Sequence, residues 1–265
     1  MAKTAIIIPI YKSDFSEHEI ISLTQCIKVL SNHTIIVVKP EHLQLPAQFA
    51  DVVSHSESFD DRFFSGIRGY NELMLSPVFY ERFLTYEYIL IYQLDCFVFK
   101  DELDKWCARN WDYIGAPWIK KTYHKNRFQL WFSNFKERLE IKYENPDGSK
   151  HLQREQRNRV GNGGFSLRRT KKFYNIAQRM KTTIDHYLTQ DSHLFNEDVF
   201  WSIEVNRSGE SLSIPDYTEA LKFAFEVPAV KAADFTGDNV PFGCHDWDHY
   251  IKYWRPIFKN LGYQI

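Results

Sequence analysis

Residues 88–99 read YILIYQLDCFVF, and they form the strongest strand signal in the chain. The run is apolar at almost every position, which is typical of a strand in a parallel sheet that helices cover on both faces. Its polar interruption lies at residues 93–95 and includes Asp95. A carboxylate in such a strand is costly to bury unless it is paired, hydrogen-bonded or bound to a cation. Asp95 is therefore a candidate ligand for a divalent cation or for the ribose of a nucleotide, or else it caps a loop where the strand ends.

The segments upstream of this run alternate between strand-like and helix-like patterns. Ser16, with Glu19 three positions later, predicts a helix start, and apolar residues recur after it with helical period. The other expected elements are strands at 5–10, 34–38 and 51–54 and helices at 67–75 and 78–84. This alternation predicts an α/β fold with a mostly parallel, Rossmann-like central sheet flanked by helices. Ligands of such sheets bind beyond the carboxyl ends of the strands, which brings residues 9–12, 39–41 and 93–95 to one crevice.

The chain shows no internal repeat and no linker rich in Pro, Gly or Ser, so we expect a single domain over residues 1–265. Residues 119–160 are expected to form an insertion between the halves 1–118 and 161–265. From 119 to 172 there are 15 Lys and Arg against 5 Asp and Glu, although the formal net charge of the chain is −1. The near-neutral total argues against a dedicated nucleic-acid binder.

Within this basic block, apolar residues between 128 and 139 recur at helical spacing. They predict an amphipathic helix with a basic flank. Such a helix either packs on its own domain or makes a peripheral contact with an anionic membrane through residues 119–142.

The composition is that of an ordinary globular protein. No apolar run approaches the roughly 18–20 residues of a membrane span, and residues 1–20 lack the layout of a signal peptide. The four cysteines form no C-x-x-C pair, which fits reduced thiols. We therefore expect a cytoplasmic protein, at most peripheral to the inner face of the membrane. Most of the 21 Phe, 15 Tyr and 7 Trp are expected to fill the core, while some Tyr and Trp rings could stack on sugars.

Residues 161–168 read GNGGFSLR and combine glycines with the start of a regular element. Ser166 stands where a dinucleotide-binding G-x-G-x-x-G would need its third glycine, and Arg168 stands where a G-x-S-x-G nucleophile elbow would need its last. Neither fingerprint is supported. The glycines instead offer backbone that a ligand can approach closely, or they form a tight turn.

Residues 196–201 read NEDVFW and open an apolar helical stretch. Asn196 is a good helix N-cap, and two acids suit the positive end of the helix dipole. Asp198 in such a first turn is expected to keep a low pKa, and so to be an ionised base that can take a proton from a hydroxyl. Because adjacent helical residues point roughly 100° apart, only one of Glu197 and Asp198 is expected to face a ligand.

Residues 242–249 read FGCHDWDH and place two His and two Asp within five positions. Imidazole and carboxylate suit Mn, Zn or Fe, although the spacing matches no closed structural site. His245 and His249 are candidate ligands, whereas Asp246 could instead cap the helix that follows. This cluster also motivates a third hypothesis, a metal-dependent phosphodiester hydrolase. Such an enzyme would need more carboxylates converging on the metal than the sequence offers.

In this order, these segments resemble glycosyltransferases of the GT-A type. More closely, they resemble an uncharacterised bacterial family assigned to glycosyl transfer. The stretches that carry the resemblance span about residues 5–250 and are RGYNELMLS at 68–76, QLD at 93–95, DYIGAPW at 112–118, GNGGFSLR at 161–168, NEDVFW at 196–201 and FGCHDW at 242–247. The resemblance implies a GT-A-like fold in which residues 1–118 bind a nucleotide sugar and residues 161–265 bind the acceptor.

The resemblance also implies which residues meet the donor. A UDP-sugar is the favoured donor, and a glycan or a lipid-linked glycan is the implied acceptor. The residues implied on the donor side are Pro9 and Tyr11 beside the base, Arg68 and Asn71 near the nucleotide, Asp95 at the diphosphate, and Gly163 and Gly164 facing the sugars.

By the same resemblance, Asp95 would hold a divalent cation, Mn or Mg, between the diphosphate oxygens, with His245 as a further ligand of the metal or the diphosphate. The related motif is commonly Asp-x-Asp, whereas this chain has Asp95-Cys96-Phe97. A single carboxylate makes a weaker cation site, so Arg168 or Arg159 is expected to supply part of the charge that stabilises the leaving group.

The sequence thus predicts a hexosyltransferase of bacterial surface-polysaccharide synthesis. Asp198 would deprotonate the acceptor hydroxyl, with Glu197 as the neighbouring catalytic candidate, and the anomeric configuration would invert; a retaining enzyme could present the same acids. The alternative, motivated by the lone Asp95, is a non-catalytic glycan-binding module that keeps a transferase scaffold.

Overall fold

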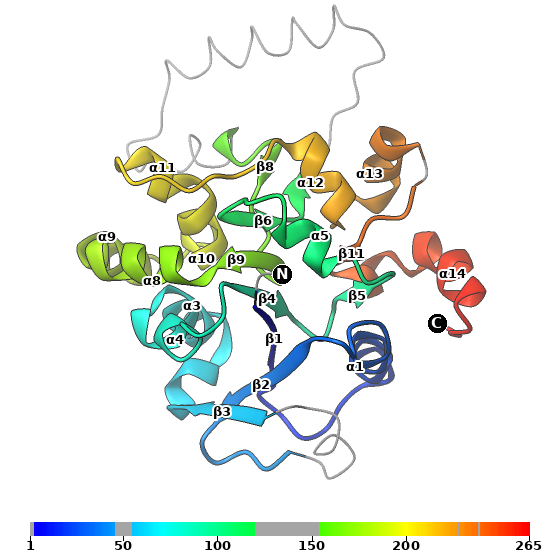
Figure 1. Ribbon diagram of the computed structural model, residues 1–265, viewed down its shortest axis with the longest axis horizontal. Helices are drawn as coiled ribbons and strands as arrows, with labels where there is room; N and C mark the ends of the chain where they lie inside the picture. The colour runs from blue at the N-terminus through cyan, green and yellow to red at the C-terminus, as the bar shows by residue number, and fades with distance from the viewer. Residues whose placement is uncertain (1–2, 46–54, 120–153, 227, 238) are drawn as a thin grey trace, which may run out of the picture.

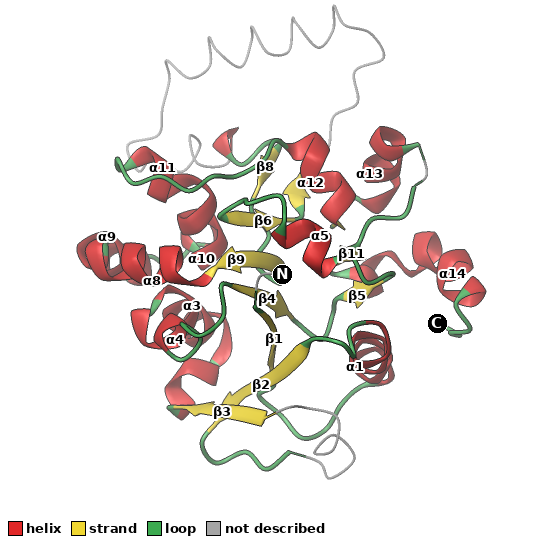
Figure 2. Ribbon diagram, in the orientation of Figure 1, coloured by secondary structure: helices red, strands yellow, loops and turns green. Residues whose placement is uncertain are grey.

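The computed structural model describes residues 3–45, 55–119, 154–226, 228–237 and 239–265 (Figure 1). Its main sheet has six strands, and helices lie on both faces (Figure 2). In spatial order the strands are β3 (His55–Phe59), β2 (Thr34–Pro40), β1 (Thr4–Pro9), β4 (Tyr88–Tyr92), β9 (Phe165–Arg169) and β6 (Tyr113–Gly115). The pairs from β3 to β4 are parallel, and β9 is antiparallel to both β4 and β6. The predicted α/β fold with a mostly parallel central sheet is confirmed.

Strand β1 is buried on both of its faces. Ile6 and Ile8 belong to one core, and Ala5 and Ile7 belong to the other. The helices of the first core are α1 (Glu17–Val29), α5 (Leu103–Cys107) and α12 (Tyr217–Phe223), and those of the second are α3 (Gly66–Leu75), α4 (Pro77–Glu81), α8 (Thr170–Arg179) and α9 (Lys181–Leu188). Because side chains alternate between the faces of a strand, an uninterrupted apolar run requires cover on both sides.

The predicted helix start at Ser16 is confirmed. The Ser16 hydroxyl accepts a hydrogen bond from the Glu19 backbone N–H at 3.3 Å, and the Glu19 carboxylate accepts one from the Ser16 N–H at 2.8 Å. The predicted helices at 67–75 and 78–84 correspond to α3 and α4. The strand expected at 51–54 lies outside the described residues, and the third strand of the sheet is β3.

The run at 88–99 is two strands rather than the one that the sequence suggests. Strand β4 ends at Tyr92, a turn closes with a 3.0 Å hydrogen bond from Cys96 N–H to the Gln93 carbonyl, and β5 (Phe97–Val98) then leaves the main sheet. Strand β5 joins a second sheet with the order β10 (Ala224–Phe225), β11 (Gly243–Cys244), β5. The polar interruption therefore marks the passage of the chain from one sheet to the other.

The second sheet brings together three segments that are distant in sequence. Phe225 lies opposite Cys244, and Cys244 lies opposite Phe97. Glu226 directly follows β10, and His245 directly follows β11. Because β5 is antiparallel to β11, Asp95, which precedes β5, lies at the same end of this sheet. A third core, shared with α13 (Ala229–Thr236) and α14 (Ile251–Asn260), packs against these strands.

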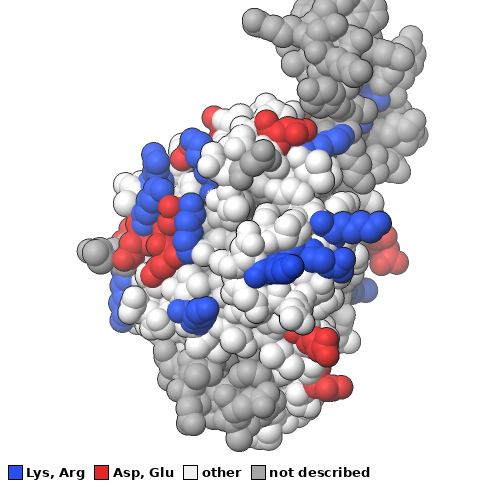
Figure 3. All heavy atoms as spheres, turned by 90° about the vertical axis from the view of Figure 1, so that its right-hand side faces the viewer, with Lys and Arg blue, Asp and Glu red and all other residues white. Residues whose placement is uncertain are grey.

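The basic insertion begins and ends on a pair of short strands. Strand β7 (Pro117–Trp118) is antiparallel to β8 (Arg159–Val160). The helix predicted between 128 and 139, and all but the first residue of the predicted membrane contact at 119–142, lie outside the described residues. On the face that carries α1 and α14, the Lys and Arg of the described residues lie among Asp, Glu and uncharged side chains (Figure 3). Within the described ranges, no helix combines the length and apolarity that a membrane span requires.

Candidate active site

A cavity of about 700 Å³ lies beside the carboxyl ends of β1 and β4. The predicted site residues that line it are Pro9, Tyr11, Asn71, Asp95, Gly163, Gly164, Glu197, Asp198 and His245. These residues come from segments up to 236 positions apart, since Pro9 and His245 line the same space. Arg68 is exposed on α3, and Arg159 is exposed on β8; neither lines the cavity.

Asp95 and His245 face each other on one side of the cavity. The Asp95 Oδ1 lies 3.3 Å from the His245 Nε2, and Gln93 Oε1 lies 3.2 Å from the same nitrogen. Burial alone would raise the pKa of Asp95, but the neighbouring imidazolium lowers it below its ordinary value. For His245, burial has the opposite effect and lowers the pKa. The Asp95 and Glu226 carboxylates outweigh burial and raise the pKa of His245 well above its ordinary value.

Glu226 lies beside Nδ1 of His245 and was not predicted from the sequence. Its Oε1 lies 3.5 Å from His245 Nδ1 and accepts a 2.6 Å hydrogen bond from the Asn162 side chain. The side-chain oxygen Oδ1 of Asn162 accepts in turn from the Gly164 N–H at 2.9 Å. Only the pairing of β10 with β11 brings Glu226 to this place, and no local motif signals it.

The donor atoms at Asp95 and His245 fit a divalent cation such as Mn or Mg. A carboxylate oxygen and an imidazole nitrogen lie within 4.8 Å of each other and of Cys96 Sγ. The oxygen suits both ions and the nitrogen suits Mn²⁺, and a cation bound at His245 would take the place of the ring proton. Burial raises the pKa of the Cys96 thiol well above its ordinary value, and Sγ donates to the Gly164 carbonyl at 3.2 Å. Cys96 is therefore a structural thiol rather than a thiolate ligand.

The two aspartates and the second histidine of the 242–249 stretch form a separate group. Asp246, Asp248 and His249 lie within 4.8 Å of one another, and the His249 ring contacts Asp246. Asp246 occupies the N-cap position of the short helix Trp247–Tyr250, but its side chain makes no cap hydrogen bond. The predicted capping role of the Asp246 side chain is therefore wrong.

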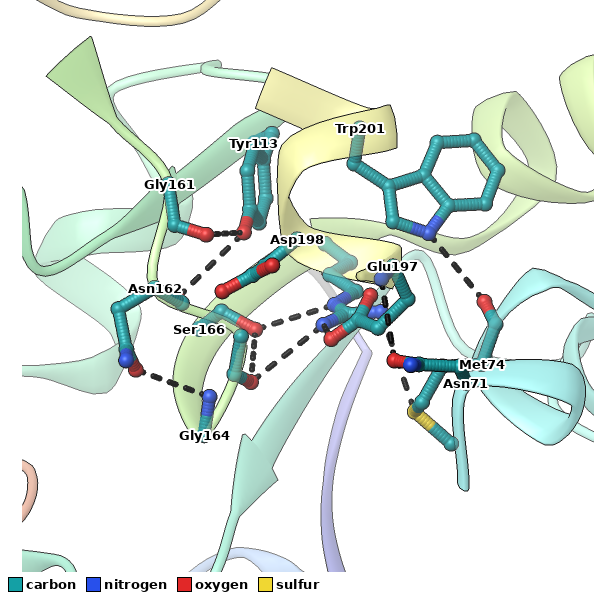
Figure 4. Close-up of polar contacts among 12 residues, drawn as sticks. Asn71, Met74, Tyr113, Gly161, Asn162, Gly164, Ser166, Glu197, Asp198 and Trp201 are labelled. Carbon is teal, nitrogen blue, oxygen red and sulfur yellow. Dashed lines mark hydrogen bonds and ion pairs between the residues drawn. The ribbon is translucent and has the colours of Figure 1, made fainter. Parts of the chain in front are cut away.

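Glu197 and Asp198 open the helical segment formed by α10 (Glu197–Val199), Phe200–Glu204 and α11 (Val205–Arg207). The cap comes from Asn71 rather than from the side chain of Asn196. Asn71 accepts from the Glu197 N–H at 3.1 Å and donates to the Asn196 side chain at 2.9 Å. The two carboxylates diverge, and that of Asp198 points to the side where Tyr113 and Asn162 lie (Figure 4).

Glu197 forms a buried ion pair with Arg168. Its Oε1 lies 2.9 Å from Arg168 Nη2, and the two side chains are 4 % and 0 % exposed. Arg168 also donates to Tyr80 at 2.9 Å and to Ser166 at 3.0 Å. The expectation that Arg168 stabilises a leaving group is therefore wrong, because its guanidinium is enclosed and already holds a carboxylate.

Asp198 has a raised pKa, so the expectation of a low one is wrong. Burial is the largest cause, followed by the negative charges of Glu197 and Glu226. A 2.8 Å hydrogen bond from the Val199 N–H favours the ionised form but does not offset these effects. Asp198 is therefore a more basic carboxylate than its helix position alone suggests.

Gly163 and Gly164 leave room for the functional side chains on either side of them. A Cβ at Gly163 would lie 2.0 Å from Glu197 Oε1, and one at Gly164 would lie 2.2 Å from His245 Nε2. The loop is held by Tyr113, which donates to the Gly161 carbonyl at 2.7 Å, and by Ser166, which donates to that of Gly163 at 2.8 Å (Figure 4). Gly163 therefore packs against Glu197, and Gly164 packs against His245.

Residues 54–245 match the model of the family described as "Protein of unknown function (DUF5672)". The chain belongs to this family. The description of this family names no activity. The resemblance to a bacterial glycosyltransferase family therefore stays a prediction. No curated protein matches the sequence.

Solved glycosyltransferases share the fold. Core-mannan synthase A from Aspergillus fumigatus is 11 % identical, with a TM-score of 0.50 over 77 % of this chain and 70 % of that one. The galactosyltransferase LgtC is 10 % identical, with a TM-score of 0.50 over 91 % of this chain and 86 % of that one. At these identities the likeness shows the GT-A fold alone.

Proposed function

We propose that the protein is a glycosyltransferase that moves a hexose from a nucleoside-diphosphate sugar to a hydroxyl of a glycan or a lipid-linked glycan. One observation carries the proposal: the Asp95–His245 pair and Asp198 line the same cavity. The GT-A fold supports it, since core-mannan synthase A is described in an Mn/GDP form and LgtC in complex with donor and acceptor sugar analogues.

In this proposal the donor lies across the carboxyl ends of β1 and β4. Pro9 and Tyr11 flank the base, and a UDP-sugar is the donor that we favour. Asp95 and His245 would hold a divalent cation, which would offset the charge of the departing diphosphate. Arg68 has no role here, because it lies outside the cavity lining.

Asp198 is the proposed general base. It removes the proton of the acceptor hydroxyl while that oxygen bonds to the anomeric carbon. The bond between that carbon and the diphosphate breaks, the electron pair leaves with the diphosphate, and the configuration inverts. The raised pKa makes Asp198 a stronger base, whereas Glu197 is engaged in its buried ion pair with Arg168.

A thermal-shift screen of UDP, GDP and their hexose conjugates, with and without Mn²⁺, tests the proposal. We expect stabilisation by at least one nucleotide sugar, strengthened by Mn²⁺, and release of the nucleotide when an acceptor glycan is added. Binding of free glycan without any nucleotide would favour the non-catalytic glycan-binding module. No response to any nucleotide would contradict the transferase.

Gly164→Ala is expected to weaken Mn²⁺ binding at least tenfold, because its Cβ would displace the His245 ring. Mn²⁺ titration followed by electron paramagnetic resonance measures the effect. Gly163→Ala is the matched variant, since its Cβ meets Glu197 instead and should leave Mn²⁺ affinity within about twofold of the wild type. Equal losses in the two variants would argue against His245 as a metal ligand.

A further inference from the structure

Glu226 lies at the ring nitrogen of His245 that does not face Asp95. The His245 Nε2 lies 3.3 Å from Asp95 Oδ1, and the Nδ1 lies 3.5 Å from Glu226 Oε1. The side chains of His245 and Glu226 are only 12 % and 13 % exposed. His245 lines the cavity, whereas Glu226 does not. Glu226 would therefore affect a bound cation through the imidazole rather than by direct contact.

A second contact holds the Glu226 carboxylate in place. Its Oε1 accepts a 2.6 Å hydrogen bond from the Asn162 side chain, and the Oδ1 of Asn162 accepts one from the Gly164 N–H at 2.9 Å. Gly164 in turn packs against His245, since a Cβ at this glycine would lie 2.2 Å from the Nε2 of the ring. The imidazole is thus held on both sides, by Glu226 at Nδ1 and by the glycine backbone beside Nε2.

The position of Glu226 is typical of a carboxylate that supports a metal-binding histidine. Such a histidine binds the metal through one ring nitrogen and directs its other N–H to a carboxylate, a carbonyl or a water. This contact fixes the orientation of the ring and makes the metal-binding nitrogen a stronger ligand. A further acid matters in this chain, because Phe97 stands where the related Asp-x-Asp motif has its second aspartate.

We propose that Glu226 is a positioning residue of the cation site, which orients His245 so that its Nε2 and Asp95 bind the same divalent cation. The inference rests on the proposed function and deepens it, because it gives a site with one aspartate ligand a second acid that acts indirectly. Glu226 does not contact the cation. It keeps the N–H at Nδ1 engaged, which leaves Nε2 as the nitrogen that binds.

Glu226→Gln tests the proposal, because glutamine keeps the side-chain shape and an oxygen for Asn162 but removes the charge. Mn²⁺ titration of the full chain, followed by electron paramagnetic resonance, should show an affinity about tenfold lower than that of the wild type. Electron spin echo spectra of the bound Mn²⁺ should also lose intensity from the imidazole nitrogen. Metal binding is a better readout than turnover, because after burial and the charge of Glu197, the charge of Glu226 also raises the pKa of Asp198.

Glu210→Gln is the matched control, since it removes a carboxylate that pairs with Arg179 outside the cavity. Its Mn²⁺ affinity should stay within about twofold of that of the wild type. If Glu226→Gln does not fold, Glu226→Asp decides, because it keeps the charge but withdraws it from His245 and should also weaken Mn²⁺ binding.

The outcomes separate this role from the proposed function. Unchanged Mn²⁺ affinity in the Glu226 variant, or a nitrogen signal as strong as that of the wild type, would overturn the positioning role alone. A wild-type protein that binds no Mn²⁺ would instead overturn the cation site of the proposed function, and the positioning role with it.

Discussion

Asp198→Asn is expected to lower turnover by a factor of about 10²–10⁴ while making the protein more resistant to heat at neutral pH. The amide keeps the acceptor oxygen for the Val199 N–H, but it cannot take a proton from an acceptor hydroxyl. Donor affinity should change little, because the carboxylate acts on the acceptor. Asp198 would thus be a group that the enzyme retains for activity at the expense of stability.

The stability gain has a defined pH dependence. The folded-state pKa of Asp198 lies well above 3.8, so between pH 3.8 and that pKa the folded protein binds more protons than the unfolded chain. Stability from this group is therefore present at low pH and is lost as pH rises through the folded pKa. The melting temperature of Asp198→Asn should exceed that of the wild type near pH 7, and the difference should vanish below about pH 4.

Melting curves and turnover at matched pH values measure both effects. Asp185→Asn serves as the control, because its carboxylate is exposed and pairs with Lys181 on the same helix. It should alter neither property appreciably. Full turnover in Asp198→Asn would remove Asp198 as the base, and a lower melting temperature at pH 7 would contradict its raised pKa.

Arg168→Met is expected to reduce the free energy of unfolding by about 3–5 kcal/mol. Both partners of the Arg168–Glu197 pair are buried, so removal of the guanidinium leaves a carboxylate without a counter-charge. The same change deprives Tyr80 and Ser166 of a hydrogen-bond donor. Urea denaturation of the wild type and the variant measures the loss.

Two further variants separate the ion pair from simple packing. The double change of Arg168→Met with Glu197→Met should recover part of the stability, since no isolated charge remains. Arg179→Met breaks an exposed pair with Glu210 and should have only a small effect. If Arg168→Met were as stable as Arg179→Met, the Arg168–Glu197 pair would have no structural role.

Local patterns were sufficient for several elements in the first half of the fold. The Ser16–Glu19 capping box and the double-sided apolar strands predict α1, β1, β2 and β4 because each depends on neighbouring residues in the chain. The parallel sheet then explains why Pro9, Tyr11 and Asp95 meet, since the carboxyl ends of β1 and β4 lie at one edge. Asp95 itself was predictable as a costly polar interruption.

The remaining parts of the site depend on contacts that no local pattern encodes. Glu226 reaches His245 only through the pairing of β10 with β11. Arg168 resembles a surface residue in sequence, yet β9 runs antiparallel beside β4 and encloses its side chain next to Glu197. Burial, together with the charges of Glu197 and Glu226, likewise raises the pKa of Asp198, which the helix dipole alone would lower.

A crystal structure grown with Mn²⁺ and the nucleoside diphosphate that stabilises the protein most is the most direct test of the shared site. An anomalous difference map should place one Mn²⁺ in contact with Asp95 and His245, with the diphosphate beside it in the cavity that Asp198 lines. Manganese bound instead at Asp246, Asp248 and His249, or a nucleotide bound outside the cavity, would contradict the assignment.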